Sequence, residues 1–242
     1  MPSVTQSTSD PSQELACREL QKVVVFDFDG TVISGQSGSL ISLYLFRHGL
    51  MRARHAARLV WWGVRYTLHL PYRQGEAREL VFDALDGFEA DDVDQLMCDF
   101  YDEVIAPRYR MPAIAEIRRR KAEGCVVIFA SATFDTISDR AAELLGVDGA
   151  VGTKMARDAS GNYTGQVDGA VIAGAEKYPA VARWCDEHLG PGTWRLVGAY
   201  GDHHTDEDLL ARADEPYAVS PGRTLRHYAR RHGWAILDWK HA

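Results

Sequence analysis

Two aspartates and a glycine directly follow a short apolar run near the start of this chain. The run, Val23 to Phe26, is rich in valine, and Asp27, Asp29 and Gly30 come after it. Asp27 and Asp29 are two residues apart, so their side chains point to the same side while the backbone stays extended. Gly30 lets the backbone turn tightly and approach an anion. The pattern is typical of a nucleophilic carboxylate beside a second carboxyl group that carries protons.

A second apolar run ends in hydroxyl residues. Residues 125–130 are followed by Ser131, Ala132 and Thr133, and a helix is expected to begin there. A hydroxyl group and free backbone N–H groups at the start of a helix favour phosphate binding. A serine at this place is equally typical of a helix cap with no role in chemistry.

A third apolar run, residues 194–200, ends in Gly201 and Asp202. Asp202 follows a glycine at a strand end, much as Asp29 precedes one, and carboxylates from two strand ends can converge on Mg²⁺. Asp206 begins a run of three acidic residues in the first turn of an expected helix, where such residues are commonly partners of the helix dipole. Lys177 opens another expected helix, where a lysine is most often exposed.

A parallel sheet is needed to bring these residues together. Apolar runs alternate with helical segments, and connections of crossover length indicate an α/β fold with helices on both faces of a parallel sheet. In such sheets, ligands bind beyond the carboxyl ends of the strands. Residues 149–168 predict a short strand and a hairpin. The expected strands are 23–26, 125–130, 194–200 and 216–219, and the expected helices are 112–122, 136–145, 175–189, one from about 206, and 224–231.

About 70 residues after the first strand contain only helical patterns. Residues 32–39 are mostly small and polar and predict a flexible loop. Four helices are expected after it, at 40–48, 53–68, 75–85 and 91–105. We therefore expect an inserted four-helix cap. The predicted division is a disordered tail at 1–18, an α/β core at 19–36 and 110–242, and the cap at 37–109.

In combination and in this order, the segments resemble the four motifs of the haloacid dehalogenase-like hydrolase superfamily. The motifs are Asp27-Phe28-Asp29-Gly30-Thr31, then Ser131, then Lys177, then Gly201-Asp202 through Asp206. The helical insert resembles the cap of subfamily IB, the branch that contains phosphoserine phosphatase. The resemblance implies a Rossmann-like core and an Mg²⁺-dependent phosphatase that acts on a small phosphate monoester.

The resemblance also implies a role for each motif. Asp27 would attack phosphorus to form an aspartyl-phosphate, and Asp29 would protonate the leaving alcohol and then activate water. Asp27, the Asp29 carbonyl group and Asp202 would hold Mg²⁺, with Asp206 in support. The groups expected to bind the phosphoryl group are Gly30, Ser131, Ala132 and Lys177.

One position departs from the phosphoserine phosphatase pattern. Those enzymes carry a glutamate nine residues after the nucleophile, to hold the ammonium group of the substrate, and this chain has Gln36 there. A neutral amide cannot pair with an ammonium group in the same way, so phosphoserine is disfavoured. Other residues expected to select the substrate are Arg58, Trp62 and Arg65, along one helical stripe with His69, and His203 beside His204. Packing of the aromatic residues within the bundle is the alternative for the stripe.

Charge and composition limit the other classes of function. The net charge of −7 argues against a general nucleic-acid binder, yet residues 46–80 carry seven arginines against two glutamates, which would suit an anionic membrane surface. The most apolar window is too short and too charged to span a bilayer. The four cysteines form no CxxC pair, and residues 1–15 lack the apolar segment of a signal peptide, so we expect a reduced, cytoplasmic protein.

Three other functions are alternatives to a phosphatase. Dehalogenase chemistry has no leaving alcohol to protonate, so Asp29 argues against it. A phosphotransferase would use the same residues and stays open. A membrane-docking or protein-binding module of the same fold, with little turnover, is the alternative from another class. The sequence does not indicate an oligomeric state.

Overall fold

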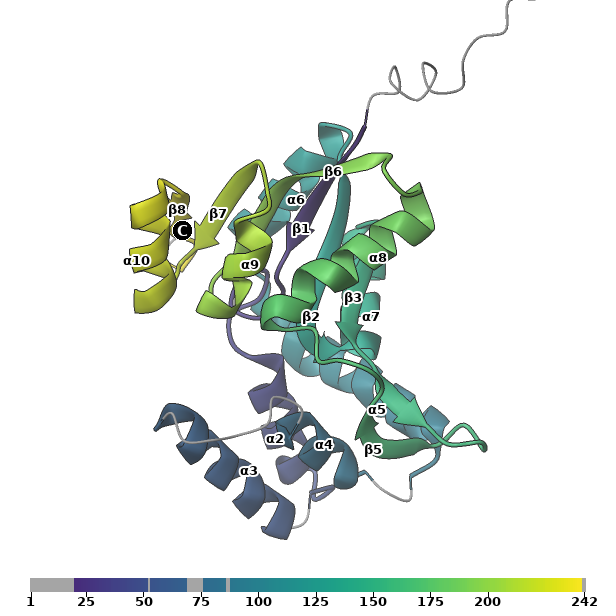
Figure 1. Cartoon of the computed structure of the whole chain (residues 1–242). Helices are drawn as coiled ribbons and strands as arrows, with labels where there is room; N and C mark the ends of the chain where they lie inside the picture. The colour runs from purple at the N-terminus through teal and green to yellow at the C-terminus, as the bar shows by residue number, and fades with distance from the viewer. Residues whose placement is uncertain (1–19, 52, 69–75, 86–87, 241–242) are drawn as a thin grey trace, which may run out of the picture.

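A six-stranded parallel sheet forms the centre of the molecule (Figure 1). The computed structural model describes residues 20–51, 53–68, 76–85 and 88–240, so the tail expected at 1–18 lies outside the described residues. The strand order is β3-β2-β1-β6-β7-β8, and every pairing is parallel. The strands are β1 (Gln21–Phe26), β2 (Val126–Phe134), β3 (Gly149–Thr153), β6 (Trp194–Gly201), β7 (Glu215–Val219) and β8 (Ala235–Leu237). The predicted α/β class is confirmed.

Strand β1 explains why both faces of the sheet are covered. It lies between β2 and β6, and its residues from Val23 to Phe26 are fully buried. Val24 and Phe26 point to one face and Val23 and Val25 to the other, as the two-residue period of a strand requires. Helices α6 (Met111–Ala122) and α7 (Asp135–Leu145) pack on the first face, and α8 (Lys177–Leu189), α9 (Glu207–Leu210) and α10 (Arg223–His232) pack on the second.

A buried arginine ties α6 to the sheet. The side chain of Arg120, on α6, donates to the hydroxyl groups of Tyr200 on β6 and Tyr217 on β7 at 3.0 and 2.9 Å. It also bonds the carboxylates of Glu116, at 3.2 Å, and Glu215, at 2.6 Å. The buried charge therefore has partners on its own helix and on two strands, which removes the cost of leaving it unpaired.

The expected hairpin is present as β4 (Met155–Arg157) and β5 (Tyr163–Val167), which pair antiparallel. Strand β5 packs against a helix of the insert, α4 (Glu76–Asp83). Strand β8 was not expected. It has only three residues, all partly or fully exposed, so it lacks the buried apolar run that identifies the other strands.

In the part of the segment between β1 and α6 that the structure describes, there are four α-helices, as expected. They are α2 (Ser37–Arg47), α3 (Ala53–Thr67), α4 and α5 (Ala90–Phe100), and α5 continues through a π-helical turn, η1 (Tyr101–Ile105), and a 3₁₀ turn, η2 (Ala106–Arg108). Figure 1 shows these helices gathered at one end of the sheet, with α3 on the side away from it. Among the described residues, every helix is too short or too polar to cross a bilayer.

The two connections between the insert and the core run side by side. The backbone N–H of Ser34 donates to the Arg108 carbonyl at 2.8 Å, and that of Arg110 donates to the Val32 carbonyl at 2.9 Å. The loop expected at residues 32–39 is shorter than predicted, because only residues 34–36 are both exposed and outside regular secondary structure. Val32 and Ile33 are fully buried where the segment pairs with the returning chain, and α2 already begins at Ser37.

Candidate active site

Three carboxylates meet at the carboxyl ends of β1 and β6. Asp27 follows β1 and Asp202 follows β6, and the backbone N–H of Asp27 donates to the Tyr200 carbonyl at 2.8 Å. Asp206 closes the short 3₁₀ turn η4 (His204–Asp206) after β6. One carboxylate oxygen from each of the three aspartates lies within 4.8 Å of the other two. Adjacent strand ends thus bring together residues that are far apart in sequence.

Lys177 lies in the middle of this cluster. It is the first residue of α8, and its side chain is 3% exposed. Its ammonium group is 2.5 Å from an oxygen of Asp27 and 2.5 Å from an oxygen of Asp206. Burial lowers the pKa of this lysine, but the two carboxylates outweigh burial and raise it overall. Lys177 is therefore a buried cation, and the alternative of a solvated surface lysine is excluded.

The carboxylates carry more negative charge than Lys177 can balance. Burial raises the pKa of Asp27 well above its usual range, although Lys177 opposes that shift. Burial and the charge of Asp206 raise the pKa of Asp202 to about 7. A divalent cation that prefers oxygen ligands would relieve this repulsion. The donor set of Asp27, Asp202 and Asp206 therefore fits Mg²⁺.

Two glycines let the carboxylates come this close. Gly30 has a φ of +79°, and a Cβ atom there would lie 2.2 Å from an oxygen of Asp202. A Cβ atom on Gly201 would lie 2.7 Å from the Cβ of Asp206. Any larger residue at either position would push a carboxylate out of the cluster.

Asp29 is held apart from the three-carboxylate cluster. Its side chain accepts hydrogen bonds from the Ser37 backbone N–H at 2.9 Å and from the Ser37 hydroxyl at 2.7 Å. The Thr133 hydroxyl donates to it at 3.1 Å. Among the described residues, the carboxylate cluster consists of Asp27, Asp202 and Asp206, and the chain turns after Asp27, where the Val32 N–H bonds the Phe28 carbonyl. A separately oriented carboxyl group is suited to proton transfer.

Ser131 lies inside strand β2 and not at the start of a helix, so both the helix-start and the helix-cap expectations are wrong. Strand β2 continues to Phe134, which pairs with Thr153 on β3, and α7 begins only at Asp135. Ser131 is buried, and its hydroxyl group lies 3.3 Å from the backbone N–H of Thr133 and 3.3 Å from its hydroxyl. Ser131 and half-buried Ala132 thus precede the threonine that binds Asp29.

The residues expected to select a substrate occupy different places. Gln36 is exposed, immediately before the first residue of α2. His203 is half-buried beside the cluster: its backbone N–H donates to Asp206 at 3.1 Å, its ring lies 3.1 Å from the Thr205 hydroxyl, and burial lowers its pKa. Both remain predictions as substrate contacts.

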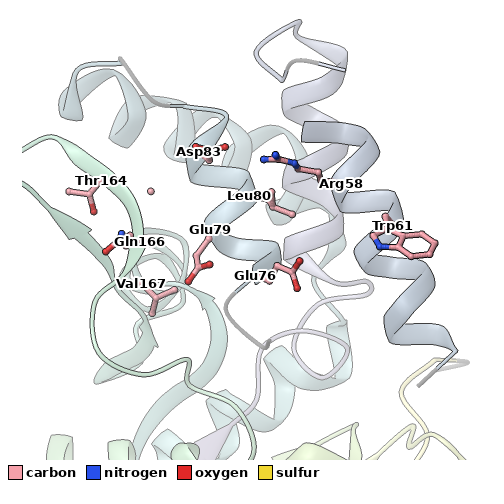
Figure 2. Close-up of a pocket in the computed structure, with 10 residues that line it drawn as sticks. Arg58, Trp61, Glu76, Glu79, Leu80, Asp83, Thr164, Gln166 and Val167 are labelled. Atoms are coloured by element: carbon pink, nitrogen blue, oxygen red, sulfur yellow. The ribbon is translucent and has the colours of Figure 1, made fainter. Parts of the chain in front are cut away.

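The arginines of α3 lie in the outer part of the insert. Arg58 lines a cleft of about 700 Å³ between α3, α4 and β5, with Trp61 and Glu79 (Figure 2). Arg65 forms an ion pair with Glu76, and Trp62 is half-buried on the same helix. Among the described residues, the lining of this cleft includes none of the carboxylates of the cluster. His69 lies outside the described residues, and a substrate role for the stripe stays a prediction.

Several contacts of the site were not predicted from the sequence. Ser37 and Thr133 bind Asp29, and the Thr31 hydroxyl donates to Asp27 at 3.2 Å. Thr31 and Thr133 are adjacent to or within the quoted motifs, so their hydroxyl groups were a usable signal. Ser37 gave no such signal, because its position depends on where α2 begins.

Comparisons with known proteins agree with this geometry. A family model described as haloacid dehalogenase-like hydrolase matches residues 24–211. A histidinol-phosphatase of Neisseria meningitidis is 25% identical over 233 residues, which is 91% of this chain and all of that protein. A Bordetella pertussis protein of unknown function has a crystal structure similar to this one, with a TM-score of 0.81 at 23% identity over 91% of this chain and 100% of that one. A phosphoserine phosphatase structure, a phospho-aspartyl intermediate analogue, shares the fold with a TM-score of 0.60 at 19% identity over 92% and 95% of the two chains.

Proposed function

This chain belongs to the haloacid dehalogenase-like hydrolase family, and from that premise we propose that it is an Mg²⁺-dependent phosphatase acting on a small phosphate monoester through an aspartyl-phosphate. The observation that carries the proposal is that two neighbouring aspartates have different binding partners. Asp27 lies in the carboxylate cluster and bonds Lys177, whereas Asp29 is held separately by Ser37 and Thr133. This difference supports a role as nucleophile for Asp27 and a role as acid and base for Asp29.

The reaction proceeds in two displacements. A carboxylate oxygen of Asp27 attacks phosphorus, the ester P–O bond breaks, and Asp29 gives its proton to the leaving alcohol. A water molecule then attacks the aspartyl-phosphate, Asp29 takes the proton from that water, and phosphate leaves with Asp27 restored. Splitting one difficult displacement into two easier ones is the advantage of covalent catalysis.

The remaining residues bind and orient the phosphoryl group. Lys177 and Ser131 would neutralise or bond its oxygens, together with the backbone N–H groups around Gly30 and Ala132. Asp27, the Asp29 carbonyl oxygen and Asp202 would hold Mg²⁺, with Asp206 in support. Bound Mg²⁺ supplies positive charge that stabilises the transferring phosphoryl group.

We propose that residues 37–109 act as a cap that selects the substrate. Ser37 supports this role, because the first residue of the insert already binds Asp29. Gln36 is neutral and exposed, so an amine-bearing ester such as phosphoserine lacks the anionic partner that it would need there. The histidinol-phosphatase relative makes histidinol phosphate a second ester to test.

Hydrolysis of p-nitrophenyl phosphate tests the proposal. Activity should require Mg²⁺ and disappear with EDTA, and Asp27→Asn should reduce it at least about a thousandfold with an unchanged circular dichroism spectrum. Asp208→Asn is the matched control, because Asp208 is an exposed aspartate on α9, two residues after Asp206 in the sequence. Near-wild-type turnover by Asp27→Asn would exclude Asp27 as the nucleophile.

A panel of phosphate esters would then define the substrate. Phosphoserine should rank low, and a preference for it would show that the inference from Gln36 was wrong. Adding an alcohol acceptor separates hydrolysis from phosphotransfer: a phosphatase releases one phosphate for each p-nitrophenol, whereas a phosphotransferase releases less phosphate than p-nitrophenol.

One surface of α3 favours a second property, contact with an anionic membrane. Trp61 and Val64 on this helix are 58% and 38% exposed, Leu68 just after it is 62% exposed, and Arg54 and Arg58 on the helix are also exposed. An apolar stripe flanked by arginines is typical of helices that lie on anionic lipid. Sedimentation with vesicles tests this membrane contact, and equal recovery with neutral and anionic vesicles would exclude it.

Free cysteines at 98, 125 and 185 are consistent with the cytoplasm, which we propose as the compartment.

A further inference from the structure

A second cavity, of about 310 Å³, lies where the insert joins the core. We call it the junction pocket, and its walls come from both connecting segments and from the end of the described chain. Its lining includes Ser34, Arg108, Tyr109, Arg110, Trp239 and Lys240. It is separate from the candidate active site, because none of Asp27, Lys177 or Asp202 lines it.

Arg110 is the unusual residue of this pocket. It directly precedes α6 and is 9% exposed. Its Nε donates to the Ile33 carbonyl at 3.4 Å, but neither Nη atom has a hydrogen-bond acceptor or a carboxylate within ion-pair distance among the residues that the structure describes. Burial lowers the pKa of Arg110, against the opposing charges of Asp202 and Asp238. A guanidinium group that lines a pocket and has donors without a protein partner is available to an anionic ligand.

The other charged residues that line the junction pocket are also positive. Arg108 and Lys240 add two further cations, and the described residues that line the pocket include no carboxylate. Asp238 lies nearby, where its carboxylate bonds the Lys240 backbone N–H at 3.1 Å and the Ser220 hydroxyl at 3.4 Å. Trp239 adds a flat ring that is itself fixed by stacking on Tyr200, with centroids 5.9 Å apart. The chemistry that this pocket offers is a rigid ring beside clustered positive charge.

We propose that the junction pocket binds a small anion, through a phosphate or carboxylate group placed against the free donors of Arg110. Bidentate bonds from arginine to such groups are among the stronger polar contacts in proteins. The volume suits a metabolite of modest size, near the lower end of ordinary ligand pockets. The proposal does not depend on the proposed catalytic activity, because it concerns binding alone.

Occupation of the pocket would act on both connecting segments at once. Ser34 lies on the segment that enters the insert, and Arg108 and Arg110 lie on the segment that leaves it. Lys240 lies beyond the last strand of the core. A bound anion would therefore hold the two segments against the core and restrict movement of the insert.

Tryptophan fluorescence and calorimetry on the full chain with Mg²⁺ test the proposal. The probes are phenylphosphonate, whose P–C bond a phosphatase does not cleave, and benzoate, so that the phosphate and carboxylate forms of the ligand are distinguished. Wild-type protein should bind at least one probe. Arg110→Gln should weaken binding about tenfold or more, and Trp239→Phe should reduce the fluorescence change.

Two further variants separate the junction pocket from the active site and guard against misfolding. Lys240→Glu changes an exposed side chain at the junction pocket and should weaken binding of the probe there at least severalfold. Lys177→Met removes the cation of the active site and should leave binding of the probe to the junction pocket unchanged. Binding that is lost in Lys177→Met but kept in Lys240→Glu would overturn the proposal, because the probe would then occupy the active site. Failure of the wild-type protein to bind either probe would also overturn it.

Discussion

Ser37 holds the carboxylate of Asp29 with two donors, its backbone N–H at 2.9 Å and its hydroxyl group at 2.7 Å. Ser37 is the first residue of α2, so the insert supplies both bonds. Thr133, on core strand β2, adds a third donor at 3.1 Å. The orientation of Asp29 therefore depends on the insert and the core together.

Loss of the Ser37 hydroxyl should impair the proton-transfer group without removing it. We expect Ser37→Ala to lower kcat for p-nitrophenyl phosphate about tenfold, equivalent to about 1.4 kcal/mol, because Asp29 loses one of its donors. KM should change little, since Ser37 bonds Asp29 and not the phosphoryl site. Ser39→Ala is the control: Ser39 is exposed in the same turn and should keep wild-type kcat. Equal rates in both variants would contradict the role of Ser37.

Replacing Gly30 should disrupt the metal site specifically. Gly30→Ala places a Cβ atom 2.2 Å from an Asp202 oxygen, so Asp202 must move. We expect activity to fall at least about a hundredfold, with weaker Mg²⁺ dependence, and stability to fall by about 1–3 kcal/mol from the strained backbone. Gly124→Ala is a matched control, because Gly124 has a similar φ of +75° but open space around it. It should lose stability and keep activity. Similar activity losses in the two variants would indicate that backbone strain alone is responsible.

Removing metal should make stability depend on pH in a definite direction. In the metal-free protein, burial and Asp206 keep the pKa of Asp202 at about 7, against 3.8 for an ordinary aspartate. The folded state thus binds more protons than the unfolded state between these values, so the free energy of unfolding should decrease as pH rises from about 4 to about 7. Urea unfolding in EDTA measures this slope.

Mg²⁺ should remove most of that dependence, because cation binding favours the ionised carboxylates. Asp202→Asn should show a smaller slope in EDTA and little stabilisation by Mg²⁺. Asp27 also has a raised pKa, so some slope should remain in this variant. A variant with the wild-type slope and the wild-type response to Mg²⁺ would exclude Asp202 from the metal site.

Glu116, a partner of Arg120, should stabilise the core in a pH-dependent way. Burial alone would raise its pKa, but hydrogen bonds from Arg119 and Tyr200 outweigh burial and lower it to about 2, from 4.5. The contribution to stability, about 3 kcal/mol at most, is present above pH 4.5 and lost as pH falls through about 2. Glu116→Gln should therefore destabilise the protein at pH 7 and much less near pH 2. Glu123→Gln, at a more exposed partner of the same arginines, should change stability by less than about 0.5 kcal/mol.

The sheet and the main motif residues could be predicted because each has a strong local signal. Val23 to Phe26 is a continuous buried run, and Asp27, Asp29 and Asp202 follow such runs, whereas Lys177 was expected in the site only from its order among the motifs. Helix α7 was also predicted closely, at 136–145 against Asp135–Leu145, but the end of the strand before it was not. Strand β2 extends past Ser131 because Phe134 pairs with Thr153, and that pairing depends on a strand elsewhere in the sequence.

Contacts between the insert and the core could also not be predicted from the sequence pattern. Residues 32–39 contain glycine and serine, which favour a loop, yet Ile33 is buried because it pairs with Tyr109 across the junction. Ser37 and Arg110 owe their positions to the same junction. Local composition predicts local conformation, and it carries little information about partners more than 70 residues away.

The hydrogen bond between Ser34 and Arg108 has a consequence for how this enzyme can diversify. The stretch between these residues leaves the core and returns to it at one place, with its ends joined by a 2.8 Å bond. Apart from Ser37, which binds Asp29, its length and composition can therefore change with little effect on strand order or on Asp27 and Asp202. If the insert selects the substrate, as proposed, changes in the rest of this stretch would alter that selection without changing the core sheet.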